Sequence, residues 1–354
     1  MDRRTAMKGM AAMGMSMKAG ALAAQDGFYV PGEDAPHERT FMQWPVSRAV
    51  HRDRAFLQEL QAAVARVANA IAAFEPVTIL ADATHHGDIR KAVSGSVELW
   101  DIPTEDLWCR DSGPIFVLDG AGGRAVRHIR FNGWGNRQVH LHDGLIAERV
   151  AAHLGLPLLP TPLKGEGGGI EWDGHGMLIA HESSWVNDNR NPVMDRDAVE
   201  AALLDAYGAQ RMIWAPGLRD EDITDYHIDA LVRFIEPGRV LINLAKTADP
   251  WNPFDAAALE TYARLQETDL KIEVVHLPER PRVRSVDFVS AYANYYLCNG
   301  AVIAAEFGDA KADAAAAEAL ARFYPGREVV TLEIDALGLN GGGIHCATQQ
   351  MPAI

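Results

Sequence analysis

A repeated pattern of apolar segments and glycine turns restricts the fold of this chain more than any other feature. A short apolar segment precedes each turn, and in most cases a second one follows, which is typical of a β-hairpin. The turn glycines Gly174, Gly238 and Gly300 are separated by 64 and 62 residues. The predicted hairpin turns are Asp119-Gly120, Asp173-Gly174, Pro237-Gly238 and Asn299-Gly300.

Segments with helical periodicity lie between the hairpins. In the first, Leu57, Leu60, Val64 and Val67 recur at the spacing of one helix face. The predicted helices are 54–74, 144–154, 195–207, 253–265 and 310–323, and short strands are predicted at 77–80, 212–214, 272–275 and 329–332. The unit of hairpin, helix and strand occurs about five times, which predicts modules around a ring. An irregular open α/β sheet is the alternative.

Composition excludes several functional classes. The net charge of −15 argues against nucleic-acid binding, which depends on Lys and Arg, and suits a cationic small molecule. No apolar stretch approaches eighteen residues, so no membrane span is predicted. Cys109, Cys298 and Cys346 show no CxxC spacing, which argues against a disulfide framework and against a Cys-rich zinc site.

The first 24 residues differ from the rest. They resemble a twin-arginine export signal, with Arg3-Arg4 followed by a modestly apolar stretch, interrupted by Lys18, and by Ala21-Leu22-Ala23. We therefore expect a periplasmic protein whose mature chain starts near Ala24; a cytoplasmic protein with an N-terminal tail is the alternative. No linker divides the remainder, so residues 25–354 are expected to form one catalytic domain.

Polar groups stand at the start of the first strand of each module. If equivalent strand ends converge on the axis of a ring, one pocket collects side chains from all five modules. The candidates are Asp111, Glu171 or Asp173, His227, Asp229, Asn294 and Cys346. A carboxylate at a strand start is usually a turn or cap residue, but five modules that each offer a polar group favour a site.

The C-terminal segment contains the candidate nucleophile. Gly341, Gly342 and Gly343 allow the backbone to approach other groups closely, and His345 and Cys346 follow. The alternative is a buried structural thiol, which we expect for Cys109 and Cys298. A thiolate can attack carbon when a neighbouring group favours its formation.

The surrounding residue types point to a guanidine as the substrate. His227 could serve as acid and base, because imidazole titrates near neutral pH. Several carboxylates around one thiol would oppose thiolate formation unless a cation binds between them, and a planar guanidinium suits paired carboxylates. Attack on its central carbon would release ammonia and leave a thiouronium, which water activated by His227 would convert to a ureido product.

These segments resemble the agmatine deiminase family, which is related to the bacterial peptidyl-arginine deiminases within the guanidino-modifying (pentein) superfamily. The resemblance runs from about residue 30 to the end of the chain. The segments that carry it are Trp108-Cys109-Arg110-Asp111-Ser112-Gly113-Pro114, Phe131-Asn132-Gly133-Trp134-Gly135, Glu166-Gly167-Gly168, Asn189-Arg190-Asn191-Pro192, His227-Ile228-Asp229, Ser290-Ala291-Tyr292-Ala293-Asn294 and Gly342-Gly343-Ile344-His345-Cys346-Ala347-Thr348-Gln349-Gln350-Met351-Pro352.

The resemblance implies an α/β fold, a five-bladed α/β propeller with pseudo-fivefold symmetry. It implies Cys346 as nucleophile, His227 as general acid and base, and Asp111 and Asp229 as the carboxylates that bind the guanidinium. The other residues expected at the substrate are Trp108, Trp134, Glu166, Glu171 and Asn294. No metal or organic cofactor is implied. The chain departs from the family at Asp225-Tyr226, where Asn-Gly is expected before the histidine, and Tyr226 would narrow the pocket or shift substrate choice.

The predicted function is hydrolysis of agmatine to N-carbamoylputrescine and ammonia, a step of putrescine biosynthesis. Free arginine is the nearest rival, with Arg110 or Arg190 as partner of its carboxylate, and peptidyl-arginine is another. An amidinotransferase would use the same thiol, and an exported guanidine-binding protein would not use it at all. The expected partner is a small cationic guanidino compound, and a homo-oligomer is compatible with the sequence.

Overall fold

A computed structural model describes residues 27–354, and the export signal predicted for residues 1–24 lies outside the described residues. Within residues 27–354 the strands form five small sheets, each of which contains antiparallel and parallel pairs. The α/β class predicted from the sequence is confirmed. None of the helices described here is both long and apolar enough to cross a membrane.

Four of the sheets are built from the predicted unit of hairpin, helix and strand. In each, two antiparallel strands are followed by a helix and by a third strand parallel to the second. The units are β4 (Ile115–Leu118), β5 (Arg124–Arg130), α5 (Ile146–Leu154) and β6 (Leu158–Lys164); β7 (Ile170–Trp172), β8 (Met177–His181), α7 (Arg196–Tyr207) and β9 (Arg211–Ala215); β10 (Val232–Glu236), β11 (Arg239–Leu244), α8 (Pro253–Gln266) and β12 (Lys271–His276); and β13 (Tyr296–Cys298), β14 (Ala301–Glu306), α9 (Ala310–Phe323) and β15 (Glu328–Glu333).

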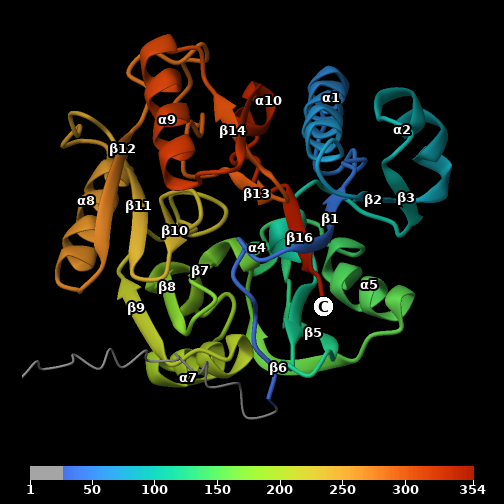
Figure 1. Ribbon diagram of the computed structural model, residues 1–354, viewed down its shortest axis with the longest axis horizontal. Coiled ribbons are helices and arrows are strands. Elements are labelled where there is room, and N and C mark those ends of the chain that lie inside the picture. Colours follow the sequence, from blue (N-terminus) through green and yellow to red (C-terminus); the bar gives the residue numbers. More distant parts are fainter. Residues whose placement is uncertain (1–26) are drawn as a thin grey trace, which may run out of the picture.

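The remaining sheet joins the two ends of the described chain. Strand β1 (His37–Gln43) pairs antiparallel with β16 (Thr348–Pro352), with Thr40 opposite Gln350, so a pair of distant strands takes the place of a hairpin. The parallel part consists of β2 (Val77–Ala81), reached through α1 (Arg54–Ile71), and β3 (Glu98–Asp101), which follows α2 (His86–Ala92). Figure 1 shows β1 and β16 side by side.

Local signals explain where the long helices begin. The carboxylate of Asp53 accepts hydrogen bonds from the backbone N–H groups of Ala55 and Phe56, at 2.8 and 3.3 Å, which caps α1. Asp195, Asn252 and Asp309 cap α7, α8 and α9 in the same way. The predicted apolar face of α1 is fully or almost fully buried, and each such side chain contributes about 1.5–3 kcal/mol.

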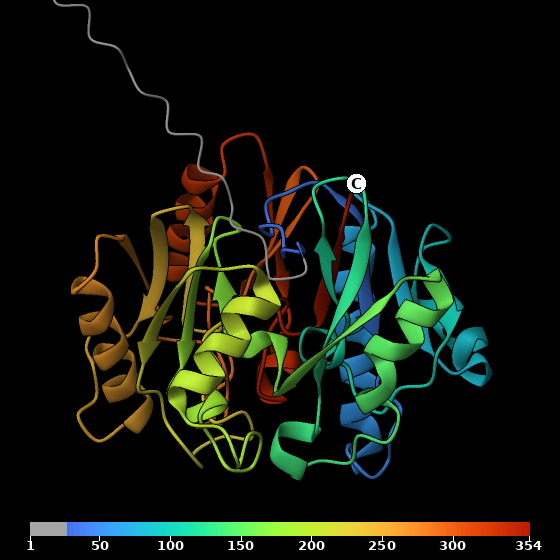
Figure 2. The same cartoon turned by 90° about the horizontal axis from the view of Figure 1, so that it is seen from below.

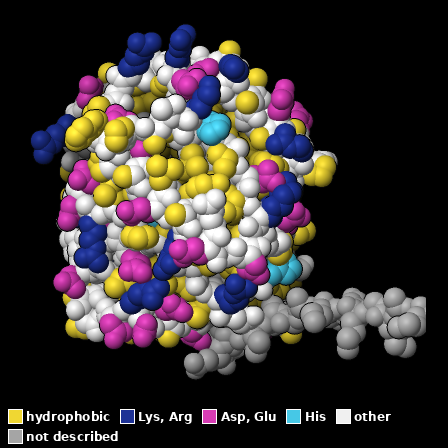
Figure 3. Space-filling view, turned by 90° about the vertical axis from the view of Figure 1, so that its left-hand side faces the viewer, with side chains coloured by type: hydrophobic (Ala, Val, Ile, Leu, Met, Phe, Trp, Pro, Cys, Tyr) yellow, Lys and Arg dark blue, Asp and Glu magenta, His cyan; other side chains and the backbone are white. Residues whose placement is uncertain are grey.

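The sheets lie around the middle of the molecule, with the long helices toward its periphery (Figures 1 and 2). The described chain also contains four short α-helices, α3 (Cys109–Ser112), α4 (Gly133–Asn136), α6 (Glu182–Trp185) and α10 (Asp335–Leu339), and three 3-10 helices, η1 (Ala83–His85), η2 (Asp143–Leu145) and η3 (Gly167–Gly169). On the face that carries α8 and β12, basic and acidic side chains are interspersed (Figure 3), so the net negative charge forms no continuous acidic patch there. Attraction for a cation must then come from local groups.

Candidate active site

The segments that precede β4, β10, β13 and β16 meet around one cavity of about 710 Å³, whereas the segment before β7 (residues 166–169) does not line it. Each of these polar segments is a loop or short helix rather than the start of a strand. The predicted site residues that line the cavity are Trp108, Asp111, Trp134, His227, Asp229 and Cys346. They come from α3, α4, the loop before β10 and the loop between α10 and β16, as the convergence of strand ends predicts.

Cys346 is held by Asn294 from the neighbouring module. The amide Nδ2 of Asn294 donates to the Cys346 Sγ at 3.1 Å, and its Oδ1 accepts from the Cys346 backbone N–H at 3.3 Å. Glycine is required here, because a Cβ on Gly343 would lie 2.5 Å from the Asn294 Oδ1 and one on Gly342 would lie 2.7 Å from the Trp108 ring. The glycine run therefore permits the close approach expected from the sequence.

The environment of Cys346 disfavours the thiolate while the cavity holds no cation. The thiol donates to Oδ2 of Asp229 at 3.3 Å. Burial, with the negative charges of Asp229 and Asp111, raises the pKa of Cys346 well above its ordinary value. The sequence predicted this effect, because several carboxylates around one thiol oppose formation of the thiolate.

Asp229 presents one carboxylate oxygen that has no partner. Its Oδ2 accepts from Nδ1 of His345 at 2.7 Å, whereas its Oδ1 is buried without a hydrogen-bond partner. Burial would raise the pKa of Asp229, but the hydrogen bond and charge of His345 lower it below the ordinary value. An ionised carboxylate with a free buried oxygen is an acceptor for a cationic donor in the cavity.

His227 is surrounded by carboxylates. Its Nε2 donates to Glu166 Oε2 at 3.2 Å, and its Nδ1 lies 3.6 Å from Asp111 Oδ1. Burial opposes the charged ring, but Asp111 and Glu166 together raise the pKa of His227 to about 9. The expectation that this imidazole titrates near neutral pH is therefore wrong for the free protein, because these carboxylates stabilise its protonated form.

Asp111 is oriented by two donors. Its Oδ1 accepts from the Gly168 N–H at 3.0 Å, and its Oδ2 accepts from the indole Nε1 of Trp134 at 2.9 Å. Burial, only partly offset by His227, raises the pKa of Asp111 to about 6. A Cβ on Gly168 would lie 2.7 Å from Asp111 Oδ1 and 2.9 Å from His227 Nδ1, so glycine keeps these groups together.

Three predicted substrate contacts, Glu166, Glu171 and Asn294, do not line the cavity, and Asn294 instead bonds to Cys346. Both oxygens of Glu166 accept from Arg190 Nε at 2.9 Å, and burial is outweighed by that charge and His227, so that the pKa of Glu166 is lowered. Glu171 accepts from the Phe234 N–H at 3.1 Å and pairs with Arg233 at 3.0 Å. Arg190 and Arg233 are thus the cationic partners of these two glutamates, for which a substrate cation was expected.

The alternative to Glu171, Asp173, is also outside the site. It lies in the turn between β7 and β8 and accepts from the backbone N–H groups of His175 and Met177, at 2.8 and 2.9 Å. It is therefore a turn residue, which is the ordinary role of Asp in this position. Cys109 and Cys298 are fully buried, and the prediction that both belong to the core is confirmed.

Several residues that support the site were missed. His345 stands directly before the nucleophile, and this adjacency was the only signal for it; Glu33, its second partner at 2.9 Å, offers no sequence signal. Asp225 was noted only as a departure, yet it binds Arg190 at 2.7 Å and so supports Glu166. Asp225 and Tyr226 have positive φ angles of 59° and 71°, which is strained for non-glycine residues.

Tyr226 lines the cavity as predicted from its position. Its ring stacks on His181 with centroids 4.8 Å apart and packs against Phe254. Burial lowers the pKa of His181 to about 4, so the stacked imidazole is neutral. Tyr226 is thus a fixed part of the cavity wall.

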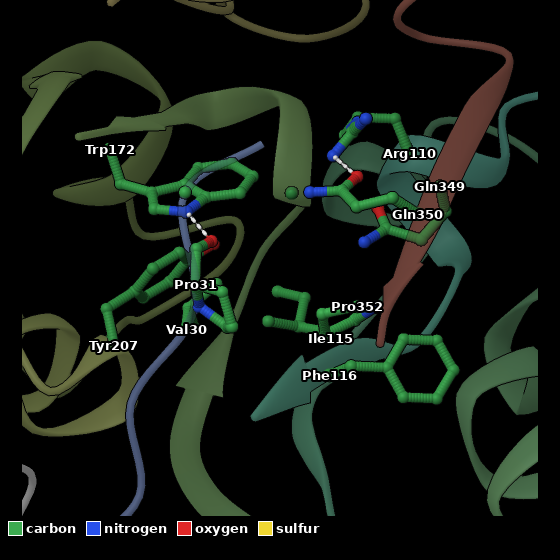
Figure 4. Close-up of a pocket in the computed structure, with 12 residues that line it drawn as sticks. Val30, Pro31, Arg110, Ile115, Phe116, Trp172, Tyr207, Gln349, Gln350 and Pro352 are labelled. Atoms are coloured by element: carbon green, nitrogen blue, oxygen red, sulfur yellow. Dashed lines mark hydrogen bonds between the residues drawn. The ribbon is translucent and has the colours of Figure 1, made fainter. Parts of the chain in front are cut away.

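A second, much smaller pocket is closed (Figure 4). It is lined by Arg110, Trp172, Tyr207 and residues of β16, and has a volume of about 10 Å³. Arg110 donates to Gln350 at 2.9 Å and Trp172 donates to the carbonyl oxygen of Pro31 at 2.7 Å, which fills the space with internal contacts. The cavity beside Cys346 is therefore the better candidate for a substrate site.

The arrangement combines a nucleophile, a proton donor and an acceptor for a cation. Cys346, the protonated His227 and Asp229, which has one buried carboxylate oxygen without a hydrogen-bond partner, all line one cavity. These groups can bind a planar cation, attack its carbon and protonate a leaving group.

The chain is similar to known proteins over nearly its whole length. The family model for Porphyromonas-type peptidyl-arginine deiminases matches residues 29–352. The agmatine deiminase of Stutzerimonas stutzeri is 35% identical over 360 residues, which cover 93% of this chain and 96% of that protein. The agmatine deiminase of Pseudomonas aeruginosa is 34% identical over 357 residues, with coverage of 93% and 96%.

A solved structure extends this similarity to the fold. The agmatine deiminase of Enterococcus faecalis superimposes with a TM-score of 0.85 at 26% identity, over 93% of this chain and 98% of that one. The resemblance recognised in the sequence is confirmed: the chain belongs to the family of Porphyromonas-type peptidyl-arginine deiminases, in which its close relatives are agmatine deiminases.

Proposed function

We propose that this protein is a cysteine-dependent guanidine deiminase that hydrolyses agmatine to N-carbamoylputrescine and ammonia. The observation that carries the proposal is the carboxylate of Asp229, whose Oδ2 lies 3.3 Å from the Cys346 Sγ and whose Oδ1 is buried without a hydrogen-bond partner. Agmatine is proposed as the substrate because the two relatives described above are named agmatine deiminases. Product analysis on agmatine tests it: one ammonia and one N-carbamoylputrescine should form for each agmatine consumed.

Substrate binding creates the nucleophile in this mechanism. The guanidinium lies between Asp111 and Asp229, with its central carbon against the Cys346 Sγ. Its positive charge offsets the two carboxylates that raise the pKa of the thiol, so the thiolate forms only in the complex. The thiol proton leaves Cys346 for solvent through the cavity as the guanidinium binds, because His227 is already protonated and cannot accept it.

His227 then acts first as an acid and afterwards as a base. The thiolate attacks the guanidinium carbon, and the protonated ring of His227 donates to the departing nitrogen, which leaves as ammonia. The neutral ring next takes a proton from water, which attacks the thiouronium carbon. Collapse of this intermediate breaks the C–S bond and releases the ureido product. Glu166 maintains the charged ring of His227, a role that replaces the substrate contact predicted for it.

The cavity wall favours agmatine over free arginine. Neither Arg110 nor Arg190 lines the cavity, because both are buried against internal acceptors. Among the described residues the lining includes no Lys or Arg, but includes Glu221, Asp222, Asp255 and Asp287. A carboxylate on the substrate would find no cationic partner there, whereas the second charge of a diamine-like chain is attracted.

The size of the cavity favours a second candidate, arginine within a peptide. A cavity of about 710 Å³ lies in the range that holds drug-sized ligands, whereas agmatine is smaller. The two candidates are separated by kcat/KM for agmatine, free arginine and an arginine-containing peptide. A tenfold preference for the peptide would replace agmatine as the substrate, and transfer of the amidino group to an added amine would instead identify an amidinotransferase.

We further propose that the five sheets are the blades of a propeller with pseudo-fivefold symmetry, in one catalytic domain of residues 25–354. We also propose that the chain is exported through the twin-arginine signal in residues 1–24. Replacement of Arg3-Arg4 by two lysines, followed by fractionation, tests the export. The wild-type protein should appear in the periplasm and the variant in the cytoplasm; equal distribution of the two would exclude this signal.

A further inference from the structure

On the side of Asp229 away from Cys346, His345 and Glu33 form a buried chain of polar groups that the proposed mechanism does not use. His345 is fully buried, and its ring bridges two carboxylates: Nδ1 lies 2.7 Å from Asp229 Oδ2 and Nε2 lies 2.9 Å from Glu33 Oε2. Ionised carboxylates only accept hydrogen bonds, so the ring satisfies both when both nitrogens carry a proton. The ring of His345 therefore joins Glu33 to the carboxylate of Asp229.

Glu33 reaches this position on the N-terminal segment (residues 28–36), which lies outside the repeated units. The segment crosses the middle of the molecule (Figure 1) and is bound to two different sheets and to the helix α7 that belongs to one of them. Tyr29 exchanges backbone hydrogen bonds with Leu118, Val30 donates to the Tyr207 carbonyl oxygen, and the Pro31 carbonyl oxygen accepts from Trp172, also visible in Figure 4. Its path is thus fixed before it reaches Glu33.

The charge of Glu33 is maintained by internal cations. Arg233 lies 3.0 Å and Arg110 3.6 Å from Glu33 Oε2, and the Leu297 N–H donates to Glu33 Oε1 at 3.2 Å. Burial is outweighed by Arg233, His345 and Arg110, so the pKa of Glu33 lies well below its ordinary value. Glu33 therefore stays ionised and holds His345 in place.

We propose that Glu33 and His345 are positioning residues, which fix Asp229 so that its Oδ2 is occupied and its Oδ1 is turned to the guanidinium. The proposal rests on the deiminase function proposed above. It assigns the N-terminal segment a part in catalysis, because this segment supplies the far end of the chain Glu33–His345–Asp229. No atom of Glu33 or His345 needs to touch the substrate.

The test uses Glu33→Gln in the full chain, with Glu75→Gln as the matched control. Glu75 also forms a buried pair with a histidine, His37 at 3.2 Å, whose ring bonds the Glu33 carbonyl oxygen at 2.9 Å but not Asp229, so this control disturbs the same segment and leaves the link to Asp229 intact. Both changes remove one buried carboxylate charge beside a histidine. Only Glu33→Gln should raise KM, by about tenfold or more, because the guanidinium loses its aligned acceptor.

The pH profile distinguishes positioning from a general structural role. In the wild type, Asp111 controls the acid side of kcat/KM near pH 6, since the pKa of Asp229 is lower. Weakening the hold of His345 raises the pKa of Asp229, so the acid side of the Glu33→Gln profile should steepen from a slope of one toward two. The charged groups that face Asp229 and His345 are Asp111, His227, Cys346, Arg233, Glu33 and Glu171.

Two further variants keep the test decisive if Glu33→Gln does not fold. Glu33→Asp retains the charge and should restore the slope toward one, whereas His345→Asn keeps a donor for Asp229 but loses the link to Glu33 and should raise KM. Wild-type KM and slope in His345→Asn or in folded Glu33→Gln would overturn the proposal. So would equal effects of Glu33→Gln and Glu75→Gln.

One measurement is independent of turnover. With ¹⁵N-labelled histidine, the ring of His345, assigned by its absence in His345→Asn, should show the signals of an imidazole protonated on both nitrogens. In Glu33→Gln one of these protons should be lost. A ring protonated on one nitrogen in the wild type would overturn the proposal, and a doubly protonated ring in a protein without deiminase activity would refute the proposed function alone.

Discussion

The buried carboxylates on the two sides of the nucleophile differ in how they are neutralised. On the closed side, Glu33 has Arg233 and His345 as partners, and its pKa is well below the ordinary value. On the cavity side, Asp111 receives two neutral donors and has no arginine, and its pKa is raised to about 6. The closed side is neutralised by buried arginine, whereas the carboxylates of the cavity side are paired only with histidines.

The same carboxylates that suit a guanidinium also disfavour the thiolate of Cys346. Burial of charge is costly, and here that cost raises the pKa of Asp111 despite the nearby His227 and disfavours the thiolate of Cys346. In the proposed mechanism, binding of the cationic substrate relieves both effects together. The thiol would then stay protonated until the substrate arrives, which would limit its reaction with other electrophiles.

The largest expected effect comes from removing the nucleophile. Cys346→Ser should lower kcat for agmatine by more than about a thousandfold, because a hydroxyl is far less acidic and less nucleophilic than a thiol. The melting temperature should change little, since serine is similar in size. Turnover above a tenth of the wild-type rate, measured as ammonia release, would remove Cys346 from the mechanism.

The carboxylates should have opposite effects on the two reactions of the thiol. Asp229→Asn or Asp111→Asn removes a charge-assisted contact worth about 1.5–3 kcal/mol, so kcat/KM should fall by roughly 10- to 100-fold. Because both carboxylates raise the pKa of Cys346, the same variants should lower it. Alkylation of Cys346 by iodoacetamide in the absence of substrate should therefore become faster at neutral pH.

The kinetic and alkylation measurements together test whether the carboxylates of the cavity bind the guanidinium and suppress the thiolate. Wild-type kinetics in either variant would mean that the carboxylate does not bind the guanidinium. Slower alkylation in both variants would mean that the cavity carboxylates do not suppress the thiolate. Cys109 and Cys298 are buried and should not react on this time scale, so labelling should reach one thiol per chain.

The pH dependence of kcat/KM should be bell-shaped, with limits near pH 6 and pH 9. Below the first, Asp111 takes up a proton and no longer attracts the cation; above the second, His227 loses the proton that the leaving nitrogen needs. Glu166→Gln removes a group that raises the pKa of His227, so the alkaline limit should move to lower pH. An alkaline limit that stays near pH 9 in this variant would assign it to a group other than His227.

The sequence predicted well those features that depend on neighbouring residues. Helix α9 has the predicted bounds 310–323, because Asp309 caps it and its apolar spacing is regular. Six residues that line the cavity were also predicted from their motifs, although the module of β7 contributes none of its polar residues to the lining. Cys346, His227, Asp111 and Asp229 therefore came from motifs placed by a repeat.

The features that were missed depend on pairs of residues far apart in the chain. Nothing near Thr40 indicates that Gln350 will lie opposite it, so the pairing of β1 with β16 was not predicted. Glu33 and Asp229 are joined only through His345. Partners of this kind follow from the closed tertiary structure, and no local pattern of polarity or spacing encodes them.

The smallest expected effect on the rate belongs to Glu171, for which a substrate contact was predicted. In sequence it resembles the carboxylates that line the cavity. In the structure Arg233 lies 3.0 Å from Glu171 and is its cationic partner. Burial nevertheless leaves the pKa of Glu171 raised. Glu171→Gln should therefore leave kcat/KM for agmatine within about twofold.

The same variant should cost about 3 kcal/mol of stability, because Arg233 loses one of its two buried carboxylate partners. Chemical denaturation gives this free energy, and steady-state kinetics on the folded protein gives the rate. Asp111→Asn reverses the pattern, with a large loss of rate and a gain or small change in stability, since its buried charge has no arginine partner. A large loss of kcat/KM in Glu171→Gln, with unchanged stability, would place a carboxylate of the closed side in the substrate site and end the distinction between the two sides.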